Sequence, residues 1–198
     1  MWTPLTNVAG SVFTETAMSD IERIMCICYD CAEQVYDKRA PTPAYADRVA
    51  RLLFMTAAHE SLLKFRRQHG FSRDSLRGAF GLWQTEYQSM LDSYRWLQAR
   101  PAALHHACEY LRGQDAEGQL DLPFREHLRM VQTPLGDALS CLSGRLHYFR
   151  VPEPVPERPY DQATYAKKYF NTELGKATAA GYQWAFQHWW RDEYARKT

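Results

Sequence analysis

The segment from residue 43 to residue 60 constrains the fold more than any other part of the sequence. Pro43 suits the first turn of a helix, where its missing backbone N–H is not needed. The apolar residues that follow recur every three or four positions, which predicts an amphipathic helix with one face in a core. The members of this face are Val49, Leu52, Leu53, Thr56 and Ala57, and Glu60 continues their spacing. We therefore expect a core-facing helix that ends in a carboxylic acid.

Helical spacing also recurs along most of the remaining chain. It predicts further helices at about residues 19–38, 83–98, 102–111, 124–131, 134–149, 160–170 and 178–196. The proline-rich stretch 151–159 must be extended, and the residues after it are too few to form a core of their own. Gly70, Gly78 and Gly81 indicate turns, with a small irregular or β element at about residues 70–81. The sequence thus predicts a single, mainly α domain spanning residues 1–198.

The composition excludes several classes of protein. A formal net charge of +1 argues against an electrostatically driven nucleic-acid binder. No apolar run approaches the roughly 18 residues of a membrane span, and the first residues show no basic region followed by an apolar core, so we expect no secretion signal. The five cysteines are odd in number, and we expect reduced thiols that are mostly packed as small hydrophobic groups.

Residues 59–61 invite two catalytic interpretations, and both fail. His59 and Glu60 begin a zinc-protease pattern, but that pattern needs a second histidine at position 63, which is leucine. Ser61 lacks the strand–Gly-x-Ser-x-Gly turn that exposes a hydrolase nucleophile. We therefore expect no metal and no cofactor, and what remains is the acid chemistry of Glu60. The structural alternative is that Glu60 is solvated or forms a salt bridge to Lys64, Arg66 or Arg67.

An acid next to apolar residues can act as a proton donor, because an apolar wall disfavours the ionised carboxylate and raises a carboxyl pKa. Cleavage of a glycosidic bond needs such a donor at the leaving oxygen. Glycoside cleavage is therefore the chemistry that a core-facing glutamate at a helix end would suit.

Three short motifs resemble the signature of the lysozyme-like superfamily, in particular soluble lytic transglycosylases and goose-type lysozymes. In that family a Glu-Ser pair ends a helix, Gly-Leu-Met-Gln follows, and Ala-Tyr-Asn-Ala-Gly comes later. This chain has Glu60-Ser61, then Gly81-Leu82-Trp83-Gln84 with Trp in place of Met, and Phe170-Asn171-Thr172 as an imperfect third element. The stretch 57–86 is also similar in its general texture to lysozyme-like proteins of bacteriophages.

The resemblance implies a role for each matched residue. Glu60 would be the general acid, and then the base, at the β-1,4 bond between N-acetylmuramic acid and N-acetylglucosamine in peptidoglycan. Ser61 would position Glu60 or the sugar. Asn171 would lie across the cleft, with Tyr169 or Phe170 near Glu60. The wall beside the cleavage point would consist of Gly81, Leu82, Trp83 and Gln84, where Gln84 offers amide hydrogen bonds.

Each of these roles has a structural alternative. Leu82 and Trp83 also suit plain core packing, and Asn171 also suits a turn that caps the preceding helix. The basic residues between 64 and 77 would attract wall carboxylates or simply form a solvated face. The aromatic residues of the last predicted helix have the spacing of a packing stripe, although aromatic rings also stack on sugars.

A second carboxylate decides between two mechanisms. Inverting hydrolysis needs a base that activates water at roughly 6.5–9.5 Å from the acid. The candidates are Asp74, in the turn-rich segment, and Glu86, just past Gln84. The resemblance also allows a transglycosylase, which needs no second carboxylate because the N-acetyl group of the substrate assists.

We therefore expect a peptidoglycan-degrading muramidase, either a hydrolase or a lytic transglycosylase, whose partners are glycan strands and other virion or tail proteins. It would be virion-associated or made in the host bacterial cytoplasm, and would act on the wall in the periplasm. The alternatives are a non-catalytic virion or tail protein that keeps a lysozyme-like fold, and a helical module that binds nucleic acid or protein.

Overall fold

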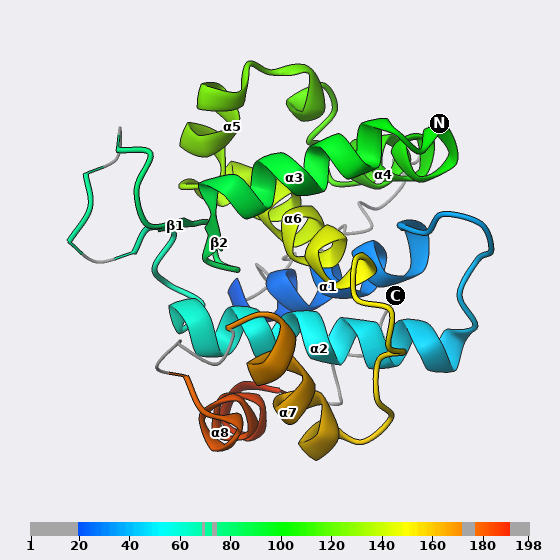
Figure 1. Ribbon diagram of the computed structural model, residues 1–198, viewed down its shortest axis with the longest axis vertical. Helices are drawn as coiled ribbons and strands as arrows, with labels where there is room; N and C mark the ends of the chain where they lie inside the picture. Colours follow the sequence, from blue (N-terminus) through cyan, green and yellow to red (C-terminus); the bar gives the residue numbers. More distant parts are fainter. Residues whose placement is uncertain (1–19, 69, 73–74, 172–176, 191–198) are drawn as a thin grey trace, which may run out of the picture.

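A computed structural model describes residues 20–68, 70–72, 75–171 and 177–190. Eight α-helices lie in these ranges, so the prediction of a mainly α protein is confirmed (Figure 1). There is also one antiparallel sheet, formed by β1 (Ala79–Phe80) and β2 (Thr85–Glu86). The helices are α1 (Asp20–Gln34), α2 (Pro43–Ser61), α3 (Tyr87–Gln98), α4 (Pro101–Gly113), α5 (Phe124–Met130), α6 (Asp137–Phe149), α7 (Pro159–Tyr169) and α8 (Ala179–Trp189), and two 3₁₀ turns, η1 (Gln119–Asp121) and η2 (Pro134–Gly136), flank α5.

The central element is α2, which crosses the molecule between two groups of helices (Figure 1). The Thr42 side chain accepts a hydrogen bond from the Tyr45 amide at 3.3 Å, and Pro43 follows this N-cap, as the sequence predicts. Helices α1 and α6 pack on one side of α2, and α7 and α8 pack on another. Residues 52–58 are consequently buried on every face of the helix, a wider burial than the predicted stripe.

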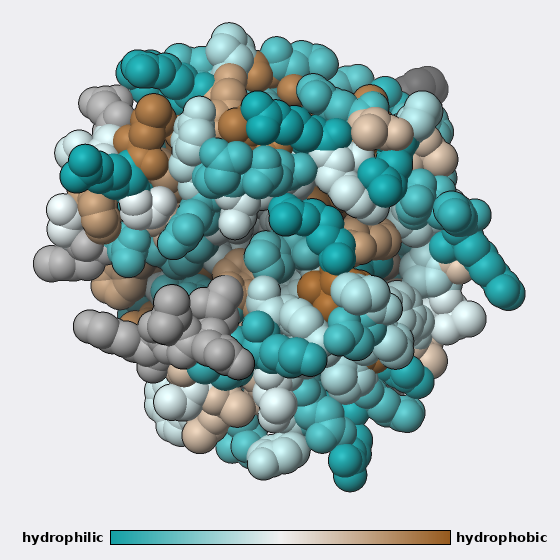
Figure 2. All heavy atoms as spheres, viewed as in Figure 1, coloured by the Kyte–Doolittle hydropathy of each residue, from teal (hydrophilic) through white to brown (hydrophobic). Residues whose placement is uncertain are grey.

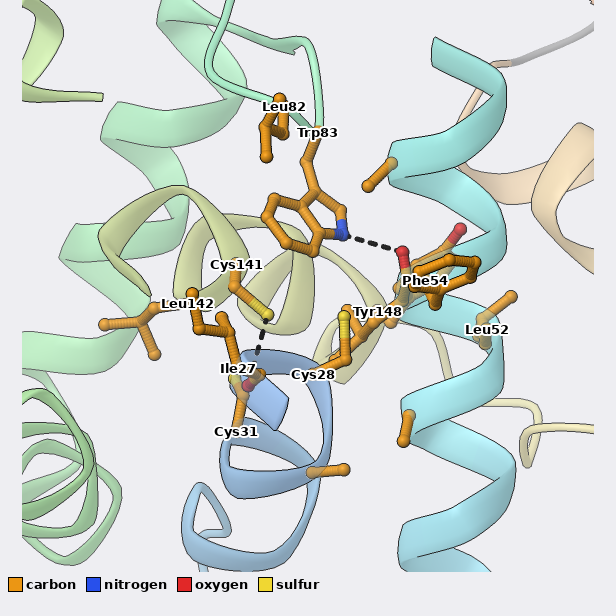
Figure 3. Close-up of a cluster of buried hydrophobic side chains, with 14 of the residues drawn as sticks. Ile27, Cys28, Cys31, Leu52, Phe54, Leu82, Trp83, Cys141, Leu142 and Tyr148 are labelled. Carbon is orange, nitrogen blue, oxygen red and sulfur yellow. Dashed lines mark hydrogen bonds between the residues drawn. The ribbon is translucent and has the colours of Figure 1, made fainter. Parts of the chain in front are cut away.

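The core lies where α1, α2 and α6 meet (Figure 3). Cys28 and Cys31 of α1 and Cys141 of α6 are fully buried there, which confirms that these three thiols pack as small hydrophobic groups. Cys26 is only partly buried and Cys108 is exposed. The face of the molecule drawn in Figure 2, which has the orientation of Figure 1, is mainly hydrophilic, with exposed apolar side chains at separate places.

Four helix boundaries differ from the sequence prediction by three or more residues. The first helix ends at Gln34 rather than near residue 38, and α8 ends at Trp189 rather than near residue 196. Helix α6 begins at Asp137 rather than at residue 134, because residues 134–136 form the 3₁₀ turn η2. Helix α3 begins at Tyr87 rather than at residue 83, because Thr85 and Glu86 pair with β1 before the helix starts. The predicted β element near residues 70–81 is thus found, with β1 inside that range and its partner just outside it.

A buried ion cluster ties the segment after α2 to the rest of the molecule. Asp137, the first residue of α6, is fully buried. Arg66 donates to both of its carboxylate oxygens at 2.7 Å, and Arg23 of α1 donates to Oδ2 at 2.6 Å. Since two guanidinium groups share one buried carboxylate, removing Asp137 would leave both of them without this counter-ion. No helix in the described ranges is long and apolar enough to cross a membrane.

Candidate active site around Glu60

Glu60 lies in the last turn of α2 and is half-buried. The helix ends immediately afterwards, because Leu62 and Leu63 adopt left-handed backbone conformations with φ of 51° and 56°. The Leu62 amide still donates to the Ala58 carbonyl at 3.1 Å, which closes the last turn. The carboxylate is therefore carried on a rigid helix at a point where the chain turns away.

Two donors from late in the chain converge on one oxygen of this carboxylate. The Asn171 amide donates to Oε1 at 3.3 Å, and the Tyr182 hydroxyl donates to the same oxygen. Asn171 follows α7, and its own Oδ1 accepts the Ala177 amide at 3.3 Å. The structure thus brings Asn171 into contact with the acid, while its position across a cleft stays a prediction.

Tyr182 of α8 is fully buried, and burial followed by the nearby Glu60 charge raises its phenol pKa well above the usual range. The hydroxyl therefore stays protonated and remains a donor at ordinary pH. Its ring lies 4.1 Å from the His59 ring, centroid to centroid. Gly181 permits this approach, since a Cβ at that position would lie 2.7 Å from the His59 ring. Burial lowers the pKa of His59, which favours a neutral imidazole beside the acid.

A second buried phenol lies near the acid. The hydroxyls of Tyr148 and Thr56 lie 2.8 Å apart, and Thr56 also donates to the Leu52 carbonyl. Burial raises the pKa of Tyr148, and the Glu60 charge contributes to this rise. The Phe170 ring lies 5.6 Å from that of Tyr148, so the predicted aromatic residue of the third motif packs against this inner layer.

The Gly81–Gln84 segment packs against α2 and the residues that follow it. The Gly81 amide donates to the Arg66 carbonyl at 2.9 Å, and the Trp83 indole donates to the Leu53 carbonyl at 2.9 Å (Figure 3). Gly81 has a φ of 71°, and a Cβ there would lie 2.0 Å from the Ser140 hydroxyl, so only glycine fits. The side chains of Leu82 and Trp83 are fully buried. This corrects the expectation that both line a substrate wall, because neither can touch a polymer outside the core.

Ser61, Tyr169 and Gln84, which the sequence predicts near the substrate, all form hydrogen bonds within the protein. Ser61 is buried, and its hydroxyl donates to the Ala57 carbonyl at 2.8 Å, so it does not reach toward a sugar. The Tyr169 hydroxyl donates to Glu153, and no hydrogen bond between Tyr169 and Glu60 is found among the described residues, so of the two predicted aromatic neighbours only Phe170 is tied to the phenols near the acid. Gln84 is half-buried, and its amide donates to the Phe65 and Gly81 carbonyls.

Of the two candidates for a second carboxylate, only Glu86 is among the described residues. Asp74 lies outside the described residues. Glu86 is exposed at the end of β2, and its side chain makes no capping hydrogen bond to α3. Among the ion pairs of the described residues none includes Glu60, so the predicted alternative of a salt bridge to residues 64–67 is wrong for the described cations.

The basic residues of this region have mainly structural partners. Arg66 belongs to the Asp137 cluster. Arg67 donates to four backbone carbonyls and stacks 4.0 Å above the Phe80 ring. His69 and Arg73 lie outside the described residues, and Lys64 and Arg77 are exposed. Within the described ranges, no cluster of three or more His, Cys, Asp or Glu side chains has an arrangement that could hold a metal ion.

Comparison with protein-family models, with curated protein sequences and with solved structures finds no match to this chain.

Sequence reasoning missed Tyr182 as a hydrogen-bond partner of Glu60 and Tyr148 as a buried phenol whose pKa the Glu60 charge raises. Tyr182 belongs to the aromatic stripe of the last predicted helix, whose spacing predicts packing, and both rings are indeed buried. The available signal was the residue type: a tyrosine at a buried position must find a partner for its hydroxyl, whereas a phenylalanine need not.

Proposed function

We propose that the chain is a peptidoglycan-degrading muramidase in which Glu60 is the general acid and then the base. The observation that carries the proposal is the convergence of the Asn171 and Tyr182 donors on Oε1 of Glu60. A carboxylic acid on a rigid helix end, oriented by neutral donors rather than by a salt bridge, suits proton transfer to a leaving oxygen.

The two donors also favour one carboxyl oxygen for catalysis. Among the described residues no hydrogen bond reaches Oε2, while Oε1 accepts two. Because a protonated carboxyl group donates through one oxygen, the proton belongs on Oε2, where it can pass to the glycosidic oxygen. After bond cleavage the same oxygen takes a proton from the incoming nucleophile, which is a water in a hydrolase or a sugar hydroxyl in a transglycosylase.

The partners of such a protein are glycan strands of peptidoglycan. A virion-associated enzyme, or one made in the host bacterial cytoplasm and released to the periplasm, would meet this substrate, and virion or tail proteins would deliver it. The lysozyme-like relationship suggested by the Glu60-Ser61 and Gly81–Gln84 motifs is part of this proposal.

The test is digestion of purified peptidoglycan by the wild type and by Glu60→Gln. We expect the variant to release soluble muropeptides roughly 10²- to 10⁴-fold more slowly, the usual effect of losing a general acid. Glu33→Gln is the matched control, because Glu33 is exposed in the last turn of α1. It should keep full activity.

The ends of the released fragments separate the two mechanisms: reducing ends indicate hydrolysis, and 1,6-anhydro ends indicate a transglycosylase. If the folded wild type releases nothing, or if Glu60→Gln is as active as the wild type, the enzymatic proposal fails. The non-catalytic virion or tail protein would then be the better account.

A further inference from the structure

A pocket of about 520 Å³ lies at the opposite end of α2 from Glu60. Its size falls in the usual range of small-molecule sites, roughly 300–1,000 Å³. The segment between α1 and α2 forms one wall, the start of α2 forms a second, and α6 forms the third; Figure 1 shows these elements together at one side of the molecule. The residues that matter here are Tyr36, Asp37, Lys38, Arg39, Tyr45 and Arg145.

Arg145 of α6 is a buried cation without a carboxylate partner. Only 3% of the residue is exposed, and no ion pair of the described residues includes it. Its Nη2 donates to the Val35 carbonyl at a long 3.4 Å, its Nε has no hydrogen-bond partner, and the Tyr45 hydroxyl is a neutral side-chain partner. The guanidinium lies 3.9 Å from the centre of the Phe149 ring. These neutral partners offset the burial of a cation only in part, so an anion supplied from outside the chain would stabilise Arg145 further.

The charges around Arg145 have the sign that an anion requires. Lys38 and Arg39 line the same pocket and are exposed. The one acid in the lining, Asp37, lies 3.8 Å from Arg100, which offsets its charge. The positive end of the α2 dipole also faces this region. Pro43 has no N–H, and the Tyr45 amide donates to the Thr42 side chain. The start of α2 therefore attracts an anion through the helix dipole and not through several free backbone N–H donors.

We propose that this pocket binds a small molecule that carries a phosphate group next to a ring. Three cations against one paired acid suit a phosphate dianion better than a monovalent carboxylate, and a guanidinium matches phosphate oxygens in geometry. The rings of Tyr36, Tyr45 and Phe149 give the pocket an aromatic lining against which a sugar or aromatic ring can pack. The site is separate from Glu60 and does not depend on the muramidase chemistry.

The test follows the ¹⁵N-resolved side-chain Nε–Hε signal of Arg145 while the full chain is titrated with phenyl phosphate, inorganic phosphate and benzoate. We expect a saturable shift with phenyl phosphate and binding roughly tenfold weaker for benzoate, since charge-assisted bonds to the dianion are stronger. Inorganic phosphate should bind more weakly than phenyl phosphate, because it lacks the ring.

Arg39→Ala tests the site without disturbing the core, because Arg39 is exposed. It should weaken phenyl phosphate binding about tenfold. Arg125→Ala, an exposed arginine on α5, is the control and should leave binding unchanged. The proposal is overturned by the absence of a saturable shift at Arg145, by benzoate binding as tightly as phenyl phosphate, or by equal effects of the two variants.

Discussion

At the scale of single residues, the environment of Glu60 depends on the hydroxyl of Tyr182. This hydroxyl is brought from 122 residues away in the sequence and donates to the oxygen that Asn171 also contacts. Tyr182→Phe keeps the buried ring and removes the donor, so the carboxylate loses its orientation. We expect muropeptide release to fall roughly tenfold or more and the free energy of unfolding to fall by about 1.5–3 kcal/mol, as for a hydrogen bond to a charged group.

Tyr110→Phe is the control for this experiment. Tyr110 is also fully buried, and its hydroxyl donates to the Ala138 carbonyl at 3.2 Å instead of to Glu60. The rate of muropeptide release should be unchanged in this variant while its stability falls slightly. The assignment of Tyr182 as a positioning residue would be contradicted by equal rate losses in both variants.

Glu60 and Asn171 could be proposed from short motifs, because their residue types and order are local properties of the sequence. The Tyr182 contact could not, since it depends on how α8 packs on α2. Dependence on packing also explains why the predicted positions of Leu82 and Trp83 in a substrate wall were wrong. Apolar residues in a motif satisfy a core and a sugar-facing wall equally well, and only the packing of Trp83 against α2 and Gly144 places it in the core.

At the scale of elements, the segment between α2 and β1 is organised by one side chain. The Arg67 guanidinium donates to the carbonyls of Ser72, Ser75, Arg77 and Ala79. We expect Arg67→Met to lower the free energy of unfolding by about 1–3 kcal/mol, because four carbonyls lose their donor at once. Amide hydrogen exchange should speed up in residues 67–81, with little change in α4.

The control is Arg77→Met, because the Arg77 side chain is exposed and contributes only its backbone to this network. It should leave both the exchange rates and the stability near those of the wild type. Similar acceleration in the two variants would show that Arg67 has no special role in ordering the segment.

Most helices could be predicted from the sequence, since the apolar period of a helix is a local pattern. The exact start of α3 could not, because β2 competes for Thr85 and Glu86. That pairing depends on β1, whose neighbouring carbonyls are held by Arg67. When contacts between distant segments decide where a helix begins, the spacing of apolar residues at that point does not show it.

At the scale of the whole molecule, three histidines link stability to pH. Burial lowers the pKa of His59, His127 and His147 below the ordinary value of 6.5. The unfolded chain therefore takes up protons at a higher pH than the folded chain does. Their contribution to stability is complete above pH 6.5 and is lost as the pH falls below 6.5 toward the lower folded pKa values.

We expect the free energy of unfolding, measured with urea, to decline between about pH 7.5 and pH 5.5. His127→Leu should decline less steeply, because a buried group that must charge in the unfolded chain has been removed. An identical slope in the wild type and the variant would exclude a contribution from this histidine.

The packing of α7 and α8 on α2 predicts that these helices unfold together. Helix α8 packs against both α2 and α7. Tyr182 of α8 is fully buried, and the ring of Trp190, which follows the helix, lies 5.4 Å from the Phe54 ring of α2. On α7, buried Gln162 donates to the Arg48 and Pro156 carbonyls, which fixes the proline-rich segment to the start of α2. We therefore expect far-UV circular dichroism and tryptophan fluorescence to report one coincident urea transition.

Amide hydrogen exchange gives the sharper form of this prediction. If α2 and α8 unfold together, their slowest amides should exchange with the same free energy, equal to that of global unfolding. Lower protection throughout α8 would show that it opens alone, and that Glu60 loses its Tyr182 donor while α2 is still folded. In that case the wild type itself would lack the Tyr182 hydrogen bond for part of the time. The loss of muropeptide release in Tyr182→Phe should then be smaller than it would be if α8 stayed folded on α2.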